Sequence, residues 1–183
     1  MYQNTRPLIL TALFAALTAI GAFLQIPLGV TSITLQFFFT ALAGLLLGPK
    51  WGALSQAVYV GLGLAGLPVF TQGGGPGYVF QPSFGFLLGL IPAAAVIGLL
   101  AGDRARPWRI VLAFVAGDAV LYLAGVPYMY LILNVYLGRA MTLAQVLWAG
   151  MVIFLPGDLL KLCAVTAISR PLLRAVPRLE NSR

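Results

Sequence analysis

Two residues that could do chemistry stand close together in an apolar stretch near the C-terminus. Asp158 and Lys161 place a carboxylate and an ammonium three residues apart, which puts both on one face of a helix. An ionisable residue at the centre of a bilayer costs roughly 2.5–3.5 kcal/mol on insertion scales, so this pair needs a polar setting. It is either a self-neutralising structural pair or a ligand site. In a ligand site, Asp158 would accept hydrogen bonds from N–H groups and Lys161 would contact an anionic or carbonyl oxygen.

A second acid lies earlier in the chain. Asp118 and Tyr122 are four residues apart, so a helix places them on one face. We expect them to complete the wall of the same cavity, although Asp118 could equally cap or pair locally.

Several classes of chemistry are excluded by the residues that the chain lacks. It has no histidine, four acidic residues and a single cysteine, Cys163. Histidine is the commonest general base and metal ligand, so Ser/His/Asp hydrolysis is ruled out, and a cysteine-cluster metal site is ruled out as well. The segment 44–50 lacks the spacing and the Ser/Thr of a P-loop. We therefore expect neither an enzyme nor a metal or other cofactor, and any ATP hydrolysis must come from other chains.

The composition points to lipid as the solvent of this chain. Of its 183 residues, 61% are hydrophobic and only 8% are charged, and the mean hydropathy is +0.98. Soluble domains carry roughly 25% charged residues. The net charge of +7 would suggest nucleic acid in a soluble protein, but the arginines lie between apolar runs, where membrane topology explains them better. We predict one all-α membrane domain, residues 1–183, that binds no nucleic acid.

Six apolar segments are candidates for spanning a bilayer, which takes roughly 20 residues of helix. Between the fifth and the sixth, residues 127–137 are apolar but too few to span. They form either a short helix against the outer face or a bent continuation of the fifth. The six segments are residues 8–26, 35–48, 51–67, 84–101, 108–124 and 143–169.

The positive charges then predict the orientation. The loops of one side carry nine basic residues and those of the other side only Arg139, while Lys161 lies inside the sixth segment. Because cytoplasmic loops are enriched in Lys and Arg, both termini are predicted to be cytoplasmic. A cleaved signal peptide at the basic start would leave five spans and disturb this asymmetry. The nine residues are Arg6, Lys50, Arg104, Arg106, Arg109, Arg170, Arg174, Arg178 and Arg183.

The segment 66–85 is an uncharged, glycine-rich loop with three prolines and four aromatic residues. Irregular backbone at membrane depth is tolerated only where it is buried in protein or lines a cavity. Either this loop rests at the membrane interface, or it is a lid over a pocket. Its polar residues Gln72, Tyr78, Gln81 and Ser83 favour the lid.

The first apolar segment carries a stripe of small residues. Ala12 with Ala16 and Ala15 with Ala19 are two small-xxx-small pairs, which let another helix approach closely in lipid. The stripe packs either against the helices of this chain or against a separate membrane partner.

These features together resemble the BioY family, the biotin-binding S-components of energy-coupling-factor (ECF) vitamin transporters. The resemblance runs from Ala12 to about Lys161, and the motifs are specific as a set although no single one would be. Asp118 is unusual for its position. The motifs are Thr34-Leu35-Gln36, Leu45-Leu46-Leu47-Gly48-Pro49-Lys50-Trp51-Gly52-Ala53, Tyr59, Gly66-Leu67-Pro68-Val69-Phe70, Gly77-Tyr78, Pro82-Ser83-Phe84-Gly85-Phe86, Gly125-Val126-Pro127-Tyr128, Asn134-Val135-Tyr136-Leu137-Gly138, and Pro156-Gly157-Asp158 with Lys161.

The resemblance implies a six-helix S-component in a prokaryotic plasma membrane that binds biotin in an outward-facing pocket. Asp158 would meet the ureido N–H groups, and Lys161 either the ureido carbonyl or the carboxylate. Loops near residues 28–33 and 73–81 would close over the ligand. The ligand-binding residues that the resemblance implies are Gln36, Tyr78, Gln81, Ser83, Asp118, Tyr122, Asp158 and Lys161.

The resemblance also implies partners. A membrane-embedded ECF coupling subunit would dock on the alanines of the first helix, and two cytoplasmic ATPases would drive release. The alternative is a proton-coupled secondary transporter of a small vitamin-like molecule, in which Asp118 or Asp158 carries the proton. The chain is short for such a transporter, and no inverted repeat is recognisable in it.

Overall fold

The structure is a computed structural model and describes residues 5–28, 31–102 and 106–175. It is mostly helical, as predicted, with one short antiparallel hairpin. The basic residues Arg104, Arg178 and Arg183 of the predicted cytoplasmic loops lie outside the described residues. In chain order the elements are α1 Thr5–Phe23, β1 Gln25–Leu28, β2 Thr31–Thr34, α2 Gln36–Leu64, the 3₁₀ helix η2 Pro76–Phe80, α3 Phe84–Ala101, α4 Pro107–Leu131, the π-helical turn η3 Ile132–Tyr136, α5 Leu143–Gly150, the 3₁₀ turn η4 Val152–Phe154 and α6 Leu155–Ala175.

Helix α2 is two helical arms joined by a sharp bend. Gly48 has φ 84° and ψ 178°, a conformation that essentially only glycine adopts, and Pro49 follows it. The two arms fold back on each other, since a Cβ built on Gly52 would lie only 2.9 Å from the Cα of Gly44. Eight residues of straight helix would separate these positions by about 12 Å. The arms correspond to the second and third predicted segments.

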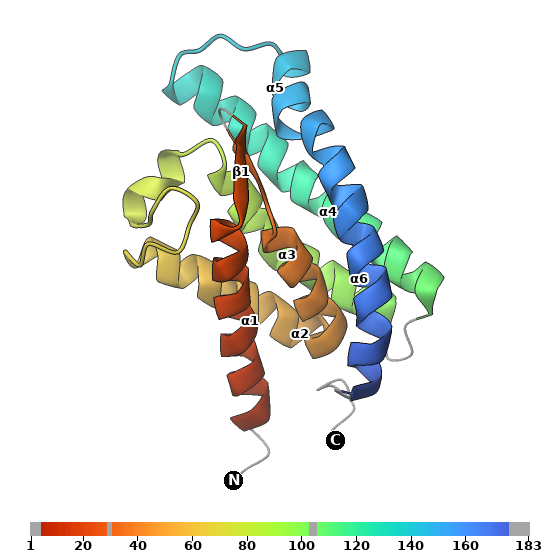
Figure 1. The fold of residues 1–183 in the computed structure, drawn as a ribbon. Coiled ribbons are helices and arrows are strands. Elements are labelled where there is room, and N and C mark those ends of the chain that lie inside the picture. The colour runs from red at the N-terminus through yellow and green to blue at the C-terminus, as the bar shows by residue number, and fades with distance from the viewer. Residues whose placement is uncertain (1–4, 29–30, 103–105, 176–183) are drawn as a thin grey trace.

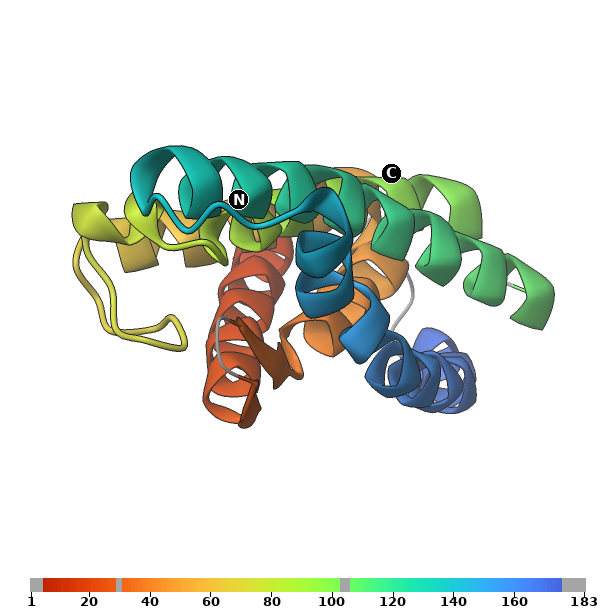
Figure 2. The ribbon, with the colours of Figure 1, turned by 90° about the horizontal axis from the view of Figure 1, so that it is seen from above.

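The helices form two layers. Figure 2 shows α3, α4 and the second arm of α2 in one layer, with α1, the hairpin, the first arm of α2 and α6 against one face of it. Helix α3 packs on both α2 and α4. The start of α1 and the end of α6 lie toward the same end of the molecule, and the hairpin lies toward the other (Figure 1).

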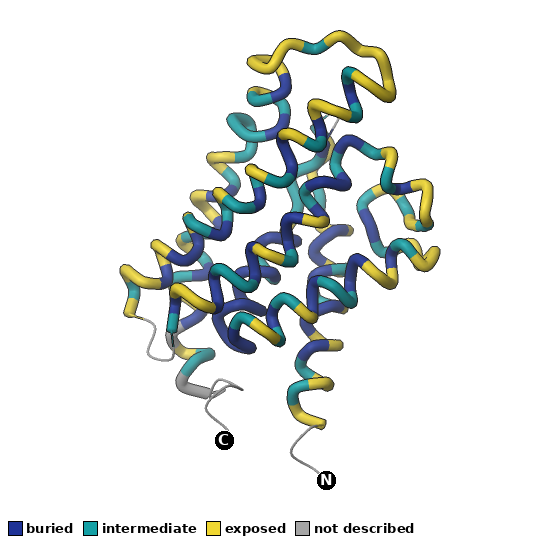
Figure 3. Tube along the Cα trace, turned by 180° about the vertical axis from the view of Figure 1, so that it is seen from behind, coloured by how far each residue is buried: buried dark blue, intermediate teal, exposed yellow. Residues whose placement is uncertain are grey.

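The outer faces of the helices are apolar, as a lipid-facing surface requires. Leu123 on α4 and Leu160 on α6 are more than 70% exposed. Aliphatic, aromatic and small side chains form the core, and Figure 3 shows buried and exposed positions alternating along the helices. Five helices within the described residues are long and apolar enough to cross a membrane, where six spans were predicted. The difference arises because the two arms of α2 count as one helix. The five are Thr5–Phe23, Gln36–Leu64, Phe84–Ala101, Pro107–Tyr136 and Leu143–Leu173.

Two predicted boundaries need correction, and one open alternative is decided. The first helix ends at Phe23 rather than at residue 26, because Gln25–Leu28 pairs with Thr31–Thr34 as a hairpin. Of the two alternatives for residues 127–137, the continuation of the fifth segment is confirmed, because α4 runs directly into the π turn η3. The sixth segment is interrupted at Met151 (φ −139°, ψ −62°) and resumes as α6.

Candidate ligand-binding site

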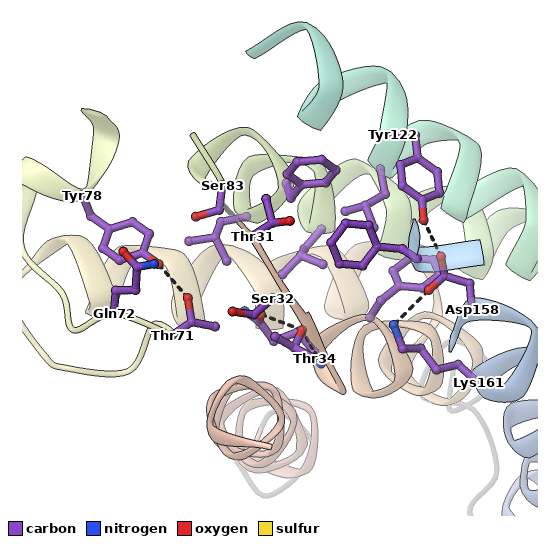
Figure 4. Close-up of a pocket in the computed structure, with 17 residues that line it drawn as sticks. Thr31, Ser32, Thr34, Thr71, Gln72, Tyr78, Ser83, Tyr122, Asp158 and Lys161 are labelled. Carbon is purple, nitrogen blue, oxygen red and sulfur yellow. Dashed lines mark hydrogen bonds and ion pairs between the residues drawn. The ribbon is translucent and has the colours of Figure 1, made fainter. Parts of the chain in front are cut away.

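One pocket opens between the hairpin, the loop after α2 and helices α2, α3, α4 and α6. It encloses about 750 Å³ with its open mouth included, which is within the usual range for small-molecule sites. Figure 4 shows the polar side chains in three groups. Tyr122, Asp158 and Lys161 stand at one end, the hairpin residues in the middle, and the loop residues at the other end.

The charged end of the pocket comes from the first turns of α6. Asp158 and Lys161 are 6% and 8% exposed, and Nζ of Lys161 lies 2.9 Å from Oδ1 of Asp158. The hydroxyl of Tyr122 donates a hydrogen bond to Oδ2 of the same carboxylate. Each carboxylate oxygen can accept more than one bond, and the ammonium carries three N–H donors. The corner therefore offers an acceptor and a donor side by side, with no net charge.

The other end comes from the loop between α2 and α3, whose residues Thr71, Gln72, Tyr78 and Ser83 line the pocket. Tyr78 is buried in the 3₁₀ helix η2, where its ring packs 4.6 Å from that of Phe70. Its hydroxyl lies 2.9 Å from the hydroxyl of Thr71. The loop is anchored where Gly75, with φ 101°, donates a 2.7 Å backbone bond to Gly63. Hydroxyl and amide groups thus reach the pocket from an ordered, uncharged loop.

The hairpin closes the middle of the pocket. Thr31, Ser32 and Thr34 of β2 line it. The hairpin is held from both sides, since Gln25 Nε2 donates to the Thr71 carbonyl at 3.1 Å and the Thr31 hydroxyl donates to the Ala149 carbonyl at 3.2 Å. It therefore bridges the loop and α5 above the site.

Apolar side chains from four elements form the rest of the wall. A small ligand with polar groups at both ends and an apolar body between them matches this arrangement, because apolar pockets fix orientation with a few placed polar groups. The apolar lining residues are Phe37, Phe86, Leu87, Leu90, Leu121 and Phe154.

Six of the eight predicted ligand residues line this pocket, and two do not. Gln81 ends the 3₁₀ helix η2 and lies outside the lining. Asp118 lies one turn before Tyr122 on α4, beyond the wall, and its buried Oδ1 has no hydrogen-bond partner among the described residues. The six that line it are Gln36, Tyr78, Ser83, Tyr122, Asp158 and Lys161.

The alanine stripe of α1 divides between the inside and the outside of the molecule. Ala12 and Ala16 are exposed, whereas Ala15 is 3% exposed and belongs to the core, with Ala19 packed partly against it. The four alanines therefore do not form one outward surface, because Ala15 faces the core and the midlines of the two pairs lie about 60° apart around the helix.

The hairpin is the part of the site that the sequence analysis missed as structure. The segment was expected to be a closing loop, yet Thr31, Ser32, Ile33 and Thr34 form a strand. Two β-branched threonines and an isoleucine, which follow a glycine in the sequence, are a strand signal. Among the described residues, no three acidic, cysteine or histidine side chains gather as a metal site would need.

Comparisons with known proteins agree with one another. Residues 1–178 match the model of the BioY family. The chain is 47% identical over 152 residues to a probable biotin transporter BioY of Lysinibacillus sphaericus, covering 82% of this chain and 78% of that one. It is 39% identical to the biotin transporter BioY of Thermotoga maritima, covering 90% and 94%. A crystal structure of the S-component for biotin from an ECF-type ABC transporter superposes with a TM-score of 0.71 at 28% identity, covering 94% and 93%.

Proposed function

Because the chain belongs to the BioY family, we propose that it binds biotin and takes it up across a prokaryotic plasma membrane as the substrate-specific subunit of an ECF transporter. The observation that carries this is the pocket itself. Its apolar body ends in the Asp158–Lys161 pair, within a chain that matches biotin transporters over most of its length. Biotin is bound and released unchanged, so the role is transport rather than catalysis.

The ureido ring of biotin occupies the charged end. That ring carries N–H donors and a carbonyl acceptor within one small group. Asp158 accepts from an N–H group while Lys161 donates to the carbonyl oxygen, which suits two side chains held 2.9 Å apart. The carboxylate of biotin fits this end poorly, because it would meet the Asp158 carboxylate at close range as well as the ammonium.

The biotin carboxylate lies toward the loop end. Hydroxyl and amide groups of Thr71, Gln72 and Ser83 are there, and an anion near the open mouth keeps part of its hydration. The apolar wall covers the bicycle and the chain, and Tyr78 lies at the loop end, toward the end of the chain. This orientation follows from matching donors to acceptors and from the cost of burying an unpaired charge.

The membrane arrangement is six crossings with both termini in the cytoplasm. The two arms of α2 count as separate crossings, and the start of α1 and the end of α6 lie toward the same end of the molecule (Figure 1). Lys50 lies over the Trp51 ring at 5.7 Å and Arg109 over the Trp108 ring at 5.4 Å, residue types that favour membrane interfaces. The pocket then opens to the outside, under the hairpin and the loop after α2.

Docking to the ECF coupling subunit uses the exposed pair Ala12 and Ala16. Two small residues four apart let a partner helix approach the α1 backbone in lipid, and both are exposed. Two cytoplasmic ATPases complete the transporter. Residues 1–183 act as one domain. The chain needs no cofactor of its own, because the partner subunits bind the ATP.

Uptake of labelled biotin tests this function. Cells that cannot make biotin would produce the chain with its coupling subunit and ATPases, with and without an ATPase variant unable to hydrolyse ATP. Biotin accumulation that needs ATP hydrolysis and survives collapse of the proton gradient supports the proposal. Accumulation that instead follows the proton gradient and needs no ATPase would exclude it.

A further inference from the structure

A buried tyrosine outside the pocket is hydrogen-bonded to a side-chain amide that lines the pocket. Tyr59 lies on the second arm of α2, is 1% exposed and is not among the residues that line the pocket. Its hydroxyl makes two hydrogen bonds. One joins it to the Val69 carbonyl at 3.1 Å, and the other joins it to the side-chain amide of Gln36 at 2.8 Å.

These two bonds determine the orientation of the Gln36 amide. A carbonyl oxygen only accepts hydrogen bonds, so the Tyr59 hydroxyl must donate its single proton to the Val69 carbonyl. The tyrosine oxygen can then only accept from Gln36, which must present its NH₂ group to it. The amide oxygen is consequently turned the other way. This follows from donor and acceptor counting, and it does not depend on telling the nitrogen from the oxygen by their positions.

The opposite side of the amide is the pocket side. There Thr34, which lines the pocket, donates its hydroxyl proton to Oε1 of Gln36 at 2.9 Å. Thr34 accepts in turn from the Gln36 backbone N–H at 3.4 Å. A carbonyl oxygen accepts two hydrogen bonds, so Oε1 keeps one acceptor position for a ligand. Gln36 is 7% exposed, and a reversed amide would instead place a donor at this position.

We infer that Tyr59 is a positioning residue that locks the Gln36 amide with its oxygen toward the ligand, so that the site selects for an N–H donor at this wall. The inference rests on the proposed function. In biotin the donors are the two ureido N–H groups, so Asp158 and Gln36 each accept from one of them. A ring that carries an oxygen in place of the second N–H meets two acceptors facing each other, and is rejected.

The test measures affinities of the purified full chain in detergent for biotin and for both carbamate analogues, in which one or the other ureido N–H is replaced by a ring oxygen. Tyr59→Phe keeps the ring and frees the amide to rotate. We expect the affinity for biotin to fall about 3- to 10-fold, the size of one net hydrogen bond. We expect the affinity for one of the two analogues to fall less than that for biotin, or to rise. The ratio of the biotin affinity to the affinity for that analogue should therefore decrease.

A double-mutant cycle separates positioning from general structural damage. In a Gln36→Leu background there is no amide to orient, so adding Tyr59→Phe should leave biotin affinity unchanged. Thermal unfolding reports stability separately, including any loss from the freed Val69 carbonyl. If Tyr59→Phe does not fold, Gln36→Leu alone should still narrow the preference for biotin over one analogue.

Two results would overturn the inference. One is an equal loss of affinity for biotin and both analogues in Tyr59→Phe, and the other is an undiminished effect of Tyr59→Phe in the Gln36→Leu background. An unchanged preference in Gln36→Leu would do the same. A wild-type chain that binds no biotin would instead refute the proposed function, so the two failures are distinguishable.

Discussion

Replacing Lys161 by methionine distinguishes the two ends of biotin in the pocket. The ammonium is 8% exposed and lies 2.9 Å from the Asp158 carboxylate. A hydrogen bond that involves a charged group contributes about 1.5–3 kcal/mol. Because about 1.4 kcal/mol is tenfold in affinity, Lys161→Met should weaken biotin binding by roughly 10- to 150-fold. Methionine nearly fills the volume of the lysine stem, which limits the effect of an empty space.

The ligand that decides the orientation is biotin amide, in which the carboxylate is neutral and the ureido ring is intact. If Lys161 meets the ureido carbonyl, Lys161→Met weakens biotin and biotin amide by the same factor. If Lys161 meets the carboxylate, the variant weakens biotin much more than the amide. Isothermal titration calorimetry or equilibrium dialysis of the purified chain in detergent measures both ligands.

Two controls keep this experiment interpretable. Lys50→Met removes a lysine that lies on a tryptophan rather than in the pocket, and should leave both affinities unchanged. Lys161→Met alone leaves Asp158 buried without its cation, which is costly. The neutral pair Asp158→Asn with Lys161→Met should therefore unfold at a higher temperature than Lys161→Met alone. A selective loss of biotin over biotin amide would refute the assignment of the ureido ring to this end.

Three further outcomes are expected. Ala16→Leu should abolish ATP-dependent biotin uptake with binding intact, whereas Ala15→Leu should lower stability by about 1–3 kcal/mol through overpacking of the core. Retained uptake in Ala16→Leu would count against docking on α1. Gly48→Ala should lower the free energy of unfolding by about 1–3 kcal/mol, measured by thermal unfolding, because the backbone conformation at Gly48 is accessible essentially only to glycine. An unchanged melting temperature would contradict this conformation at the bend of α2. Asp118→Asn should change biotin affinity less than about threefold, since Asp118 lies outside the pocket. A loss of affinity as large as that caused by Asp158→Asn would show that Asp118 takes part in binding.

Much of the fold could be predicted because its signals are local. Apolar run lengths gave α3 to the residue and α1 with a shift of three residues at each end, and the Gly48-Pro49 step marked the boundary between two helical arms. The hairpin was missed because the first apolar segment was extended to residue 26 and residues 28–33 were expected to be a loop, while pairing between two four-residue strands is a tertiary effect. The break at Met151 was missed because the apolar run continues through it, although Gly150 stands immediately before the break.

The polar residues of the pocket could be predicted where they stand in an apolar setting. Asp158 and Lys161 stood out because a membrane helix rarely carries charge. Asp118 was chosen by the same rule, but the rule does not say which face of α4 borders the pocket. Gln36 and Tyr59 illustrate the remaining limit. Their distance in sequence is 23 residues, and only the folded-back arms of α2 bring them within hydrogen-bonding distance.

Equilibrium binding of labelled biotin to the purified chain in detergent tests the central claim most directly. The account predicts saturable binding of one biotin per chain, weakened strongly in the variant that combines Asp158→Asn with Lys161→Met while the protein stays folded. A folded wild-type chain that binds no biotin, or a double variant that binds as well as the wild type, would contradict it.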